Sequence, residues 1–290
     1  MQRVDQDKRT PILPSGHPLH LGRRMQTLDV NDTVIAYEEA GSGPPLILAH
    51  GLGLDRTMWL PQIERFRATN RVIAFDVRGA GASGPLDHGR DVLARQADDL
   101  AQLLTELDVD RAVLCGVSYG GVLAQEFALT YPHRLSGLVL VDTFANRRLA
   151  DPVKRNGLRV STALAVPMLL LPPTVMEPAL RRTYARWPLA RDIVMDGYRR
   201  MRRRQTARMR HAINRADYEN QLAGVTCPVQ GIVGDDSAVL TELMESLIDA
   251  LPDASLNHVS CSFDPSNLCQ PAHFNELLDK FLTDLNWIEY

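Results

Sequence analysis

Short apolar runs alternate with amphipathic stretches along most of this chain. Alternating residues at 26–30 and 33–37, joined by Asn31-Asp32, predict an opening β-hairpin. Apolar runs typical of buried strands follow at 45–50, 71–77, 112–115, 138–142, 228–234 and 255–261. Helical spacing appears at 58–68, 91–107, 122–131, 241–251 and 271–285. Strands that alternate with helices of this length predict an α/β fold: a mostly parallel central sheet with helices on both faces.

The segment 144–222 interrupts this alternation. It predicts a helical, Arg-rich cap inserted into an α/β core that comprises 25–143 and 223–290. Side chains at 198, 201, 205, 209 and 213 fall at helical spacing among arginines, which predicts one amphipathic helix. Residues 147–215 carry 17 Lys and Arg against 4 Asp and Glu, although the net charge of the chain is only −3. A solvated basic face explains this excess. The functional alternative is docking of an anionic partner or substrate, such as an acidic carrier protein or a phosphate-bearing thioester.

Composition narrows the class of protein. The first 24 residues are polar and charged without an apolar core, which predicts a flexible N-terminal arm and no secretory signal. The longest apolar stretch, 163–173, is short and broken by proline, so we expect no membrane span. Four cysteines without C-x-x-C spacing predict reduced thiols in a cytoplasmic protein. No metal, cofactor or nucleic-acid motif appears, so the expected ligand is a small-molecule substrate.

Candidate chemistry centres on Gly116-Val117-Ser118-Tyr119-Gly120. A G-x-S-x-G between a strand run and a helix run is typical of a nucleophile elbow, because glycines permit the sharp turn that lifts the serine hydroxyl above the sheet. Ligands of parallel sheets bind outside the carboxyl ends of the strands. Five polar side chains fall near those predicted ends: His50, Asp76, Ser118, Asp142 and Asp235.

From about Met25 to its end the chain resembles the α/β-hydrolase superfamily. The resemblance rests on five segments: His50-Gly51-Leu52-Gly53, 76–83, the elbow, 131–142 and 270–278. It implies the α/β-hydrolase fold and an oxyanion hole made by the backbone N–H groups of Leu52 and Tyr119. Each such donor contributes about 3 kcal/mol to the stabilisation of the transition state. The expected substrate pocket lies between core and cap and is bordered by His50, Gly51, His88, Asp142 and Phe144.

The resemblance also implies an acid and a histidine, and this chain departs from the family at both positions. Ser237 stands at the usual acid position, which leaves Asp236, one residue earlier, or Asp142 after the preceding strand. Spacing from Leu251-Pro252-Asp253-Ala254, and independently from Pro271, places Asp264 at the histidine position. The predicted catalytic residues are therefore Ser118, Asp264 and Asp236. We expect the other histidines of the core and cap to lie elsewhere: His258 in a strand, His273 at a helix start, His88 in a loop and His211 in the cap.

Three functions stay open. The first is a non-hydrolytic step of cyclase, lyase or isomerase type, including one in biosynthesis, on a small apolar carbonyl substrate. Loss of the histidine from a serine triad costs about 10⁶ in kcat, and a carboxylate of ordinary pKa is a weak base for serine. The second is a serine hydrolase of esters or thioesters in which Ser118 has a non-standard base. The third is an inactive ligand-binding protein, against which the preserved oxyanion hole argues.

Overall fold

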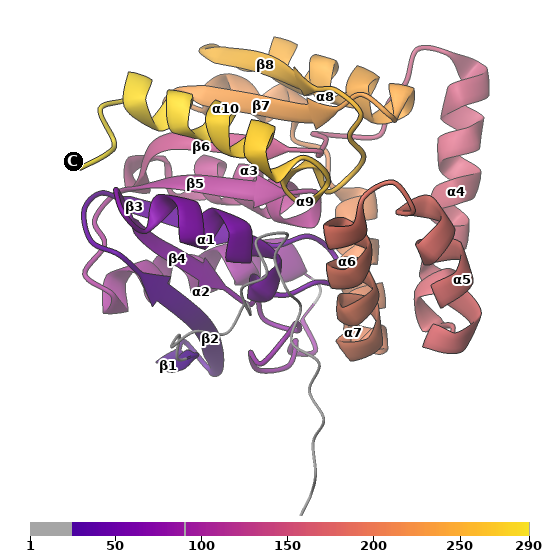
Figure 1. Cartoon of the computed structure of the whole chain (residues 1–290), viewed down its shortest axis with the longest axis horizontal. Helices are drawn as coiled ribbons and strands as arrows, with labels where there is room; N and C mark the ends of the chain where they lie inside the picture. Colours follow the sequence, from indigo (N-terminus) through magenta and orange to yellow (C-terminus); the bar gives the residue numbers. More distant parts are fainter. Residues whose placement is uncertain (1–24, 90, 290) are drawn as a thin grey trace, which may run out of the picture.

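The computed structural model describes residues 25–89 and 91–289, and the predicted N-terminal arm lies outside them. Eight strands form one sheet in the order β1-β2-β4-β3-β5-β6-β7-β8 (Figure 1). The strands are β1 Gln26–Val30, β2 Thr33–Ala40, β3 Pro45–Ala49, β4 Arg71–Phe75, β5 Ala112–Val117, β6 Leu135–Val141, β7 Val229–Gly234 and β8 Ala254–Val259. Strand β2 runs antiparallel to β1 and β4, and every other pair is parallel. The predicted, mostly parallel sheet is confirmed.

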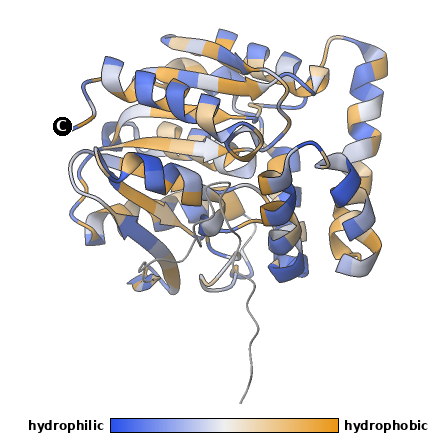
Figure 2. Ribbon diagram, in the orientation of Figure 1, coloured by the Kyte–Doolittle hydropathy of each residue, from blue (hydrophilic) through white to orange (hydrophobic). Residues whose placement is uncertain are grey.

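Helices cover both faces of the sheet, as the sequence predicts. They are α1 Leu60–Phe66, α2 Val92–Glu106, α3 Tyr119–Thr130, α8 Ala238–Asp249, α9 Ser266–Cys269 and α10 Pro271–Asp284. Side chains of successive strand residues point to opposite faces. Ile47 packs in the core under α2, α3 and α8, whereas Leu46 and Leu48 pack in the core under α1 and α10. Figure 2 shows the apolar strands enclosed by helices with polar outer faces. Each fully buried side chain of this size contributes about 2 kcal/mol by leaving water.

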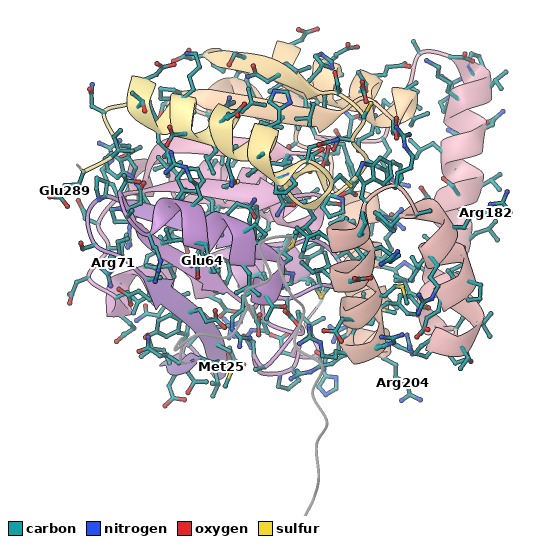
Figure 3. The ribbon with its side chains drawn as sticks, in the orientation of Figure 1. Met25, Glu64, Arg71, Arg182, Arg204 and Glu289 are labelled. Carbon is teal, nitrogen blue, oxygen red and sulfur yellow. The ribbon has the colours of Figure 1, made fainter. Side chains whose placement is uncertain are left out.

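Four helices and a 3₁₀ turn between β6 and β7 form the cap. These are α4 Pro152–Leu170, α5 Pro173–Thr183, α6 Pro188–Arg200, α7 Arg203–Arg215 and η3 Glu219–Gly224. In Figure 1 the helices α4–α7 stand beside the sheet at the end opposite the C-terminus. Figure 3 labels Arg182 on α5 and Arg204 on α7, both of which project outward from this layer.

The prediction of one continuous helix through 198–213 is wrong. The chain leaves the helix at Met201, where ψ is 143°, and α7 begins two residues later. Tertiary contacts on the two sides of the break account for it: Met201 lines a cavity, and Gln205 Oε1 accepts a hydrogen bond from the Leu86 N–H at 2.6 Å. Two short helices that both face the core give the same periodicity as one long helix.

Helix α4 packs against α7, but most of its side chains stay accessible to solvent. Thr162 is its only buried residue, and Val153 and Val160 are 79% and 60% exposed. Figure 2 shows apolar positions along the part of α4 beside α5. No helix in 25–89 and 91–289 is both long and apolar enough to cross a membrane.

The described segments contain neither a disulfide nor a candidate metal site. All four cysteines are unpaired, with Cys261 exposed and the other three buried. No group of three or more His, Cys, Asp or Glu side chains in the same segments could hold a metal ion.

Candidate active site

Ser118 occupies the sharp turn between β5 and α3. Its backbone has φ 53° and ψ −109°, a conformation that costs a non-glycine residue on the order of 1–2 kcal/mol. Two hydrogen bonds hold the turn: the Ser118 N–H donates to the Val141 carbonyl at 2.8 Å, and the Thr143 hydroxyl donates to the Ser118 carbonyl at 2.9 Å. The surrounding structure therefore imposes the strained conformation.

The glycines of the motif are required by close backbone contacts. A Cβ on Gly116 would lie 2.2 Å from the carbonyl oxygen of Gly120, and a Cβ on Gly120 would lie 2.2 Å from the carbonyl oxygen of Ala49. Neither backbone can retreat without breaking the sheet. The turn that presents Ser118 thus depends on the absence of side chains at both positions.

His50 holds the turn that carries the predicted oxyanion donor Leu52. Its Nε2 accepts a hydrogen bond from the Val77 N–H at 3.1 Å, so its Nδ1 carries the proton and donates to the Gly51 carbonyl at 2.8 Å. With both ring nitrogens engaged and the side chain buried, His50 positions the backbone and does not face the cavity. Gly51 and Leu52 line the cavity onto which Ser118 opens.

The other predicted donor, the N–H of Tyr119, belongs to the first residue of α3. The first N–H groups of a helix have no acceptor within the helix, so they are available to a ligand. The Tyr119 side chain is buried, and its hydroxyl donates to Gln96 Oε1 at 2.5 Å. That anchor fixes the start of α3 beside Ser118.

Asp264, in the loop after β8, lies beside Ser118 and lines the same cavity. Burial raises the pKa of Asp264 to about 8, and the nearby carboxyl of Asp142 acts in the same direction. The Ser118 side chain and the positive charge of Arg210 act in the opposite direction and lower this pKa, but they do not offset burial.

Asp142 lies behind Asp264, at the end of β6. It is buried and accepts hydrogen bonds from the Gly234 N–H at 2.9 Å, the Ser266 N–H at 2.6 Å and the Ser266 hydroxyl at 2.9 Å. Burial raises the pKa of Asp142 despite these bonds. The alternative acid of the sequence prediction is thus fixed to the loop that carries Asp264, and substrate does not reach it.

Asp236 does not join Ser118. It is exposed and forms an ion pair with Arg186 at 2.9 Å. The neighbouring Ser237, at the usual acid position of the family, begins α8 and accepts a hydrogen bond from the Leu240 N–H at 3.3 Å. At the position where the family usually has its catalytic acid, this chain therefore has a helix-capping serine, Ser237.

Two of the predicted pocket residues also lie away from Ser118. His88 is exposed and lines a separate groove of about 980 Å³ that it shares with His211 of α7. Phe144 is half-buried against the core, where its carbonyl oxygen accepts a hydrogen bond from the Gln125 side chain at 3.1 Å. Of the five predicted pocket residues, only Gly51 lines the cavity at Ser118.

That cavity is small, about 110 Å³, and lies between core and cap. The cap contributes Leu169, Tyr184, Val194, Tyr198 and Met201. The Tyr184 hydroxyl donates to the backbone carbonyl of Asp264 at 2.7 Å, and its ring packs edge-on against Phe263. No histidine of the described residues lines this cavity, and Asp264 is the carboxyl group that lines it together with Ser118.

No pattern in the sequence pointed to Tyr184, Ser266 or Arg210 as part of the site. Ser266 follows Asp264 by two residues, and a polar residue so close to the predicted site is a signal that could have been used. Tyr184 follows the last residue of α5, whereas Arg210 lies on α7, and only the packing of the cap brings them near the loop that carries Asp264.

Comparison with known proteins agrees with this geometry. Residues 46–265 match the model of the alpha/beta hydrolase family. A protein of Azorhizobium caulinodans, provisionally named carbamate hydrolase RutD, is 27% identical over 270 residues, which cover 88% of this chain and 97% of that protein. The 3-oxoadipate enol-lactonase 2 of Acinetobacter baylyi is 27% identical, with coverage of 90% and 97%.

Among solved structures, a thermophilic esterase from Thermogutta terrifontis superposes with a TM-score of 0.75 at 27% identity. The alignment covers 90% of this chain and 99% of the esterase. The matched family segment contains the elbow, the oxyanion turn, the cap and Asp264. The chain therefore belongs to the alpha/beta hydrolase family and is an enzyme with that fold.

Proposed function

We propose that this enzyme is a serine hydrolase that cleaves small esters, lactones or thioesters, with Ser118 as nucleophile and Asp264 as general base. One observation carries the proposal: Asp264 lines the same small cavity as Ser118, whose side chain acts on its carboxyl group, and the pKa of Asp264 is raised to about 8. A general base works best when its pKa lies near the working pH. A carboxylate this basic can take the place of the missing histidine.

The steps follow from the groups around the cavity. As Ser118 Oγ attacks the carbonyl carbon, its proton passes to ionised Asp264, and the N–H groups of Leu52 and Tyr119 stabilise the oxyanion. Protonated Asp264 then gives the proton to the leaving alkoxide or thiolate, which yields the acyl-enzyme. Water attacks the acyl group, Asp264 accepts the proton of that water, and the acid departs as Ser118 regains a proton. The net reaction consumes one ester and one water and forms one acid and one alcohol or thiol.

The names of the relatives support hydrolysis. The A. baylyi relative is an enol-lactonase, the A. caulinodans relative is provisionally a carbamate hydrolase, and the T. terrifontis structure is an esterase. All three names describe cleavage at a carbonyl group. This support places hydrolysis ahead of the non-hydrolytic step that the sequence favoured.

A non-hydrolytic lyase, cyclase or isomerase is the second candidate, and one observation favours it. With a pKa of about 8, Asp264 is mostly protonated at pH 7 and can donate a proton to a bound carbonyl group. Such a reaction needs no acyl-enzyme. It therefore predicts activity that falls as Asp264 ionises, opposite to the hydrolase.

The deciding experiment is labelling with a fluorophosphonate ester, read by intact mass at pH 7 and pH 9 with Ser118→Ala as control. A hydrolase forms one adduct on Ser118, and forms it faster at pH 9 because ionised Asp264 is then the major species. Absence of an adduct at both pH values, on protein shown by circular dichroism to be folded, would overturn hydrolysis. The second candidate would then take its place.

A further inference from the structure

Exposed apolar side chains concentrate on the outer surface of the cap. Nine large apolar side chains are exposed within residues 25–89 and 91–289, and seven of them lie on α4, on α5 or in the turn between these helices. Six of the seven follow helical spacing, with Leu170 beside them. These six form the apolar stripe: Val153, Val160, Leu164, Met168, Leu171 and Val175. A scattered apolar side chain on a surface is ordinary, whereas a continuous row marks a binding surface.

The apolar stripe faces away from the rest of the molecule. Helix α4 packs against α7 and α5 packs against α6, so that α4 and α5 form the outer layer of the cap (Figure 1). In a helix of 3.6 residues per turn, Thr162 and Leu169 project from the side of α4 opposite Val160 and Leu164. Thr162 is the buried residue of α4, and Leu169 lines the catalytic cavity. One side of α4 therefore serves the interior, and the other side presents an apolar row about 27 Å long to solvent.

Positive charge predominates on these two helices. Residues 151–183 carry five Lys and Arg against two Asp and Glu. Both carboxylates are engaged: Asp151 accepts a hydrogen bond from the Val153 N–H at 2.7 Å at the start of α4, and Glu177 pairs with Arg199 of α6 at 2.6 Å. Among the described residues, neither carboxylate forms an ion pair with a cation of α4 or α5.

Two arginines lie at the edge of the stripe. Arg159 directly precedes Val160 and is exposed. Arg182 follows Val175 by seven residues, which places both on one side of α5, and it projects outward in Figure 3. Neither arginine forms an ion pair within residues 25–89 and 91–289. The surface thus combines an apolar row with uncompensated cations.

The charge of this surface disfavours contact with another part or copy of this chain. A symmetric contact of two copies through the stripe would bring the same cations together. Residues 1–24 carry five Lys and Arg against two Asp and Glu, so the same repulsion applies to them. An anionic partner is complementary instead.

The composition of the stripe favours lipid over an acidic protein. The stripe contains neither an aromatic nor a polar side chain. Protein interfaces rely on aromatic anchors and directed hydrogen bonds, whereas a fluid lipid surface needs only buried apolar area and attraction between cations and its phosphates.

We propose that α4 and α5 bind the surface of an anionic lipid bilayer. The apolar stripe lies at the boundary between headgroups and acyl chains, and Arg159 and Arg182 contact lipid phosphates. The helices lie along the bilayer and do not cross it. This function goes beyond the proposed hydrolysis at Ser118 and does not depend on it.

Vesicle binding tests the surface without any substrate. Full-length protein is sedimented with vesicles of phosphatidylcholine alone and with vesicles of equal parts phosphatidylcholine and phosphatidylglycerol. We expect binding to the anionic vesicles to be at least tenfold tighter, and to weaken as added salt screens the arginines.

Variants of the stripe test its apolar part. Val160→Ser combined with Leu164→Ser should weaken binding to anionic vesicles at least tenfold, because both side chains then no longer enter the acyl boundary. The matched control is Val34→Ser, which removes an exposed apolar side chain of β2 and should change binding less than twofold.

A single charge change tests the arginines. Arg182→Gln should weaken binding to anionic vesicles about fivefold at low salt. Arg65→Gln removes the same charge from α1 of the core, where Arg65 pairs with Asp279 at 2.7 Å, and should change binding less than twofold.

The outcomes separate this proposal from the proposed hydrolysis. If wild-type protein binds neither kind of vesicle, or if the double serine variant binds as tightly as wild type, the lipid surface is wrong whatever the enzyme hydrolyses. If wild type forms dimers without lipid and the double serine variant does not, the stripe joins two copies and the lipid proposal also fails. Vesicle binding without cleavage of any ester would sustain the lipid surface and overturn only the hydrolysis. Thermal unfolding of each variant checks that the protein is folded, and we expect little change because these side chains are exposed.

Discussion

The Tyr184 hydroxyl, on the cap, donates a hydrogen bond to the backbone carbonyl of Asp264, on the core, at 2.7 Å. The same loop is held from the other side, where Ser266 binds Asp142 through its N–H and its hydroxyl. Asp264 is therefore positioned jointly by Tyr184, which directly follows α5 in the cap, and by Asp142, which directly follows β6 in the core. The geometry of the proposed base depends on the cap being in place.

Tyr184→Phe tests this dependence. Loss of one neutral hydrogen bond costs about 1 kcal/mol, so we expect kcat for ester hydrolysis to fall about three- to tenfold with little change in KM. Steady-state kinetics on p-nitrophenyl butyrate measure it. Tyr37→Phe, which removes a hydroxyl at the far edge of the sheet, is the matched control and should keep wild-type kcat. Equal losses in the two variants would contradict a positioning role for Tyr184.

Asp264→Asn should abolish most hydrolysis. Removal of a general base lowers kcat by about 10²–10⁴. In the wild-type enzyme only ionised Asp264 accepts the proton, so the rate should rise with pH to a plateau, with the midpoint of the rise near pH 8. Rates between pH 6 and 10 give this profile. Asp236→Asn tests the other carboxyl that the sequence predicted. The Asp236 side chain pairs with Arg186 away from Ser118, so its replacement should leave kcat within twofold. A loss of activity in Asp236→Asn alone would reverse the assignment.

Asp264→His should restore activity at lower pH. A neutral imidazole accepts a proton above about pH 6.5, and the buried carboxyl of Asp142 behind it can stabilise the imidazolium. We expect the midpoint of the rate profile to move from near 8 toward 7 and kcat at pH 7 to rise. The same pH series measures the shift. A midpoint that stays near 8 would mean that another group controls the rate.

Stability should also depend on Asp264. Its pKa is about 8 in the folded protein, whereas an aspartate in an unfolded chain titrates near 4. The folded protein binds the extra proton between these values, so the free energy of unfolding falls as pH rises from about 4 to 8. Asp264→Asn removes this loss, so its free energy of unfolding relative to wild type should rise by about 4 kcal/mol between pH 5 and pH 8. Urea unfolding at the two pH values measures it, and parallel curves would refute the raised pKa.

Local patterns in the sequence were sufficient to predict the sheet, the elbow and the position of Asp264. Gly116 and Gly120 flank Ser118 in one short motif between a strand and a helix, and the spacing from 251–254 and from Pro271 is fixed by one strand and one helix. Features of this kind depend on neighbours in the chain. The sequence alone is therefore enough to predict them.

The rest of the site depends on packing that no local pattern specifies. The raised pKa of Asp264 comes from burial and from Asp142, which lies 122 positions earlier in the sequence. Arg210 looks like its many neighbouring arginines in the sequence, although its charge acts on Asp264 in the folded protein. The break at Met201 was missed for the same reason, since periodicity records which residues face inward but not how many helices carry them.

Helix α4 contributes Leu169 to the lining of the cavity, but Thr162 is the only residue of the helix that is buried. Substitutions on a surface so lightly packed cost little folding free energy. Substitutions on α4 can therefore change the lining of the cavity at Leu169 while the packing on both faces of the sheet and the turn at Ser118 stay intact. Substitutions on the exposed side of α4 and substitutions at the elbow glycines should therefore differ sharply in their cost to folding, because only the glycines have backbone atoms within 2.2 Å of an added Cβ.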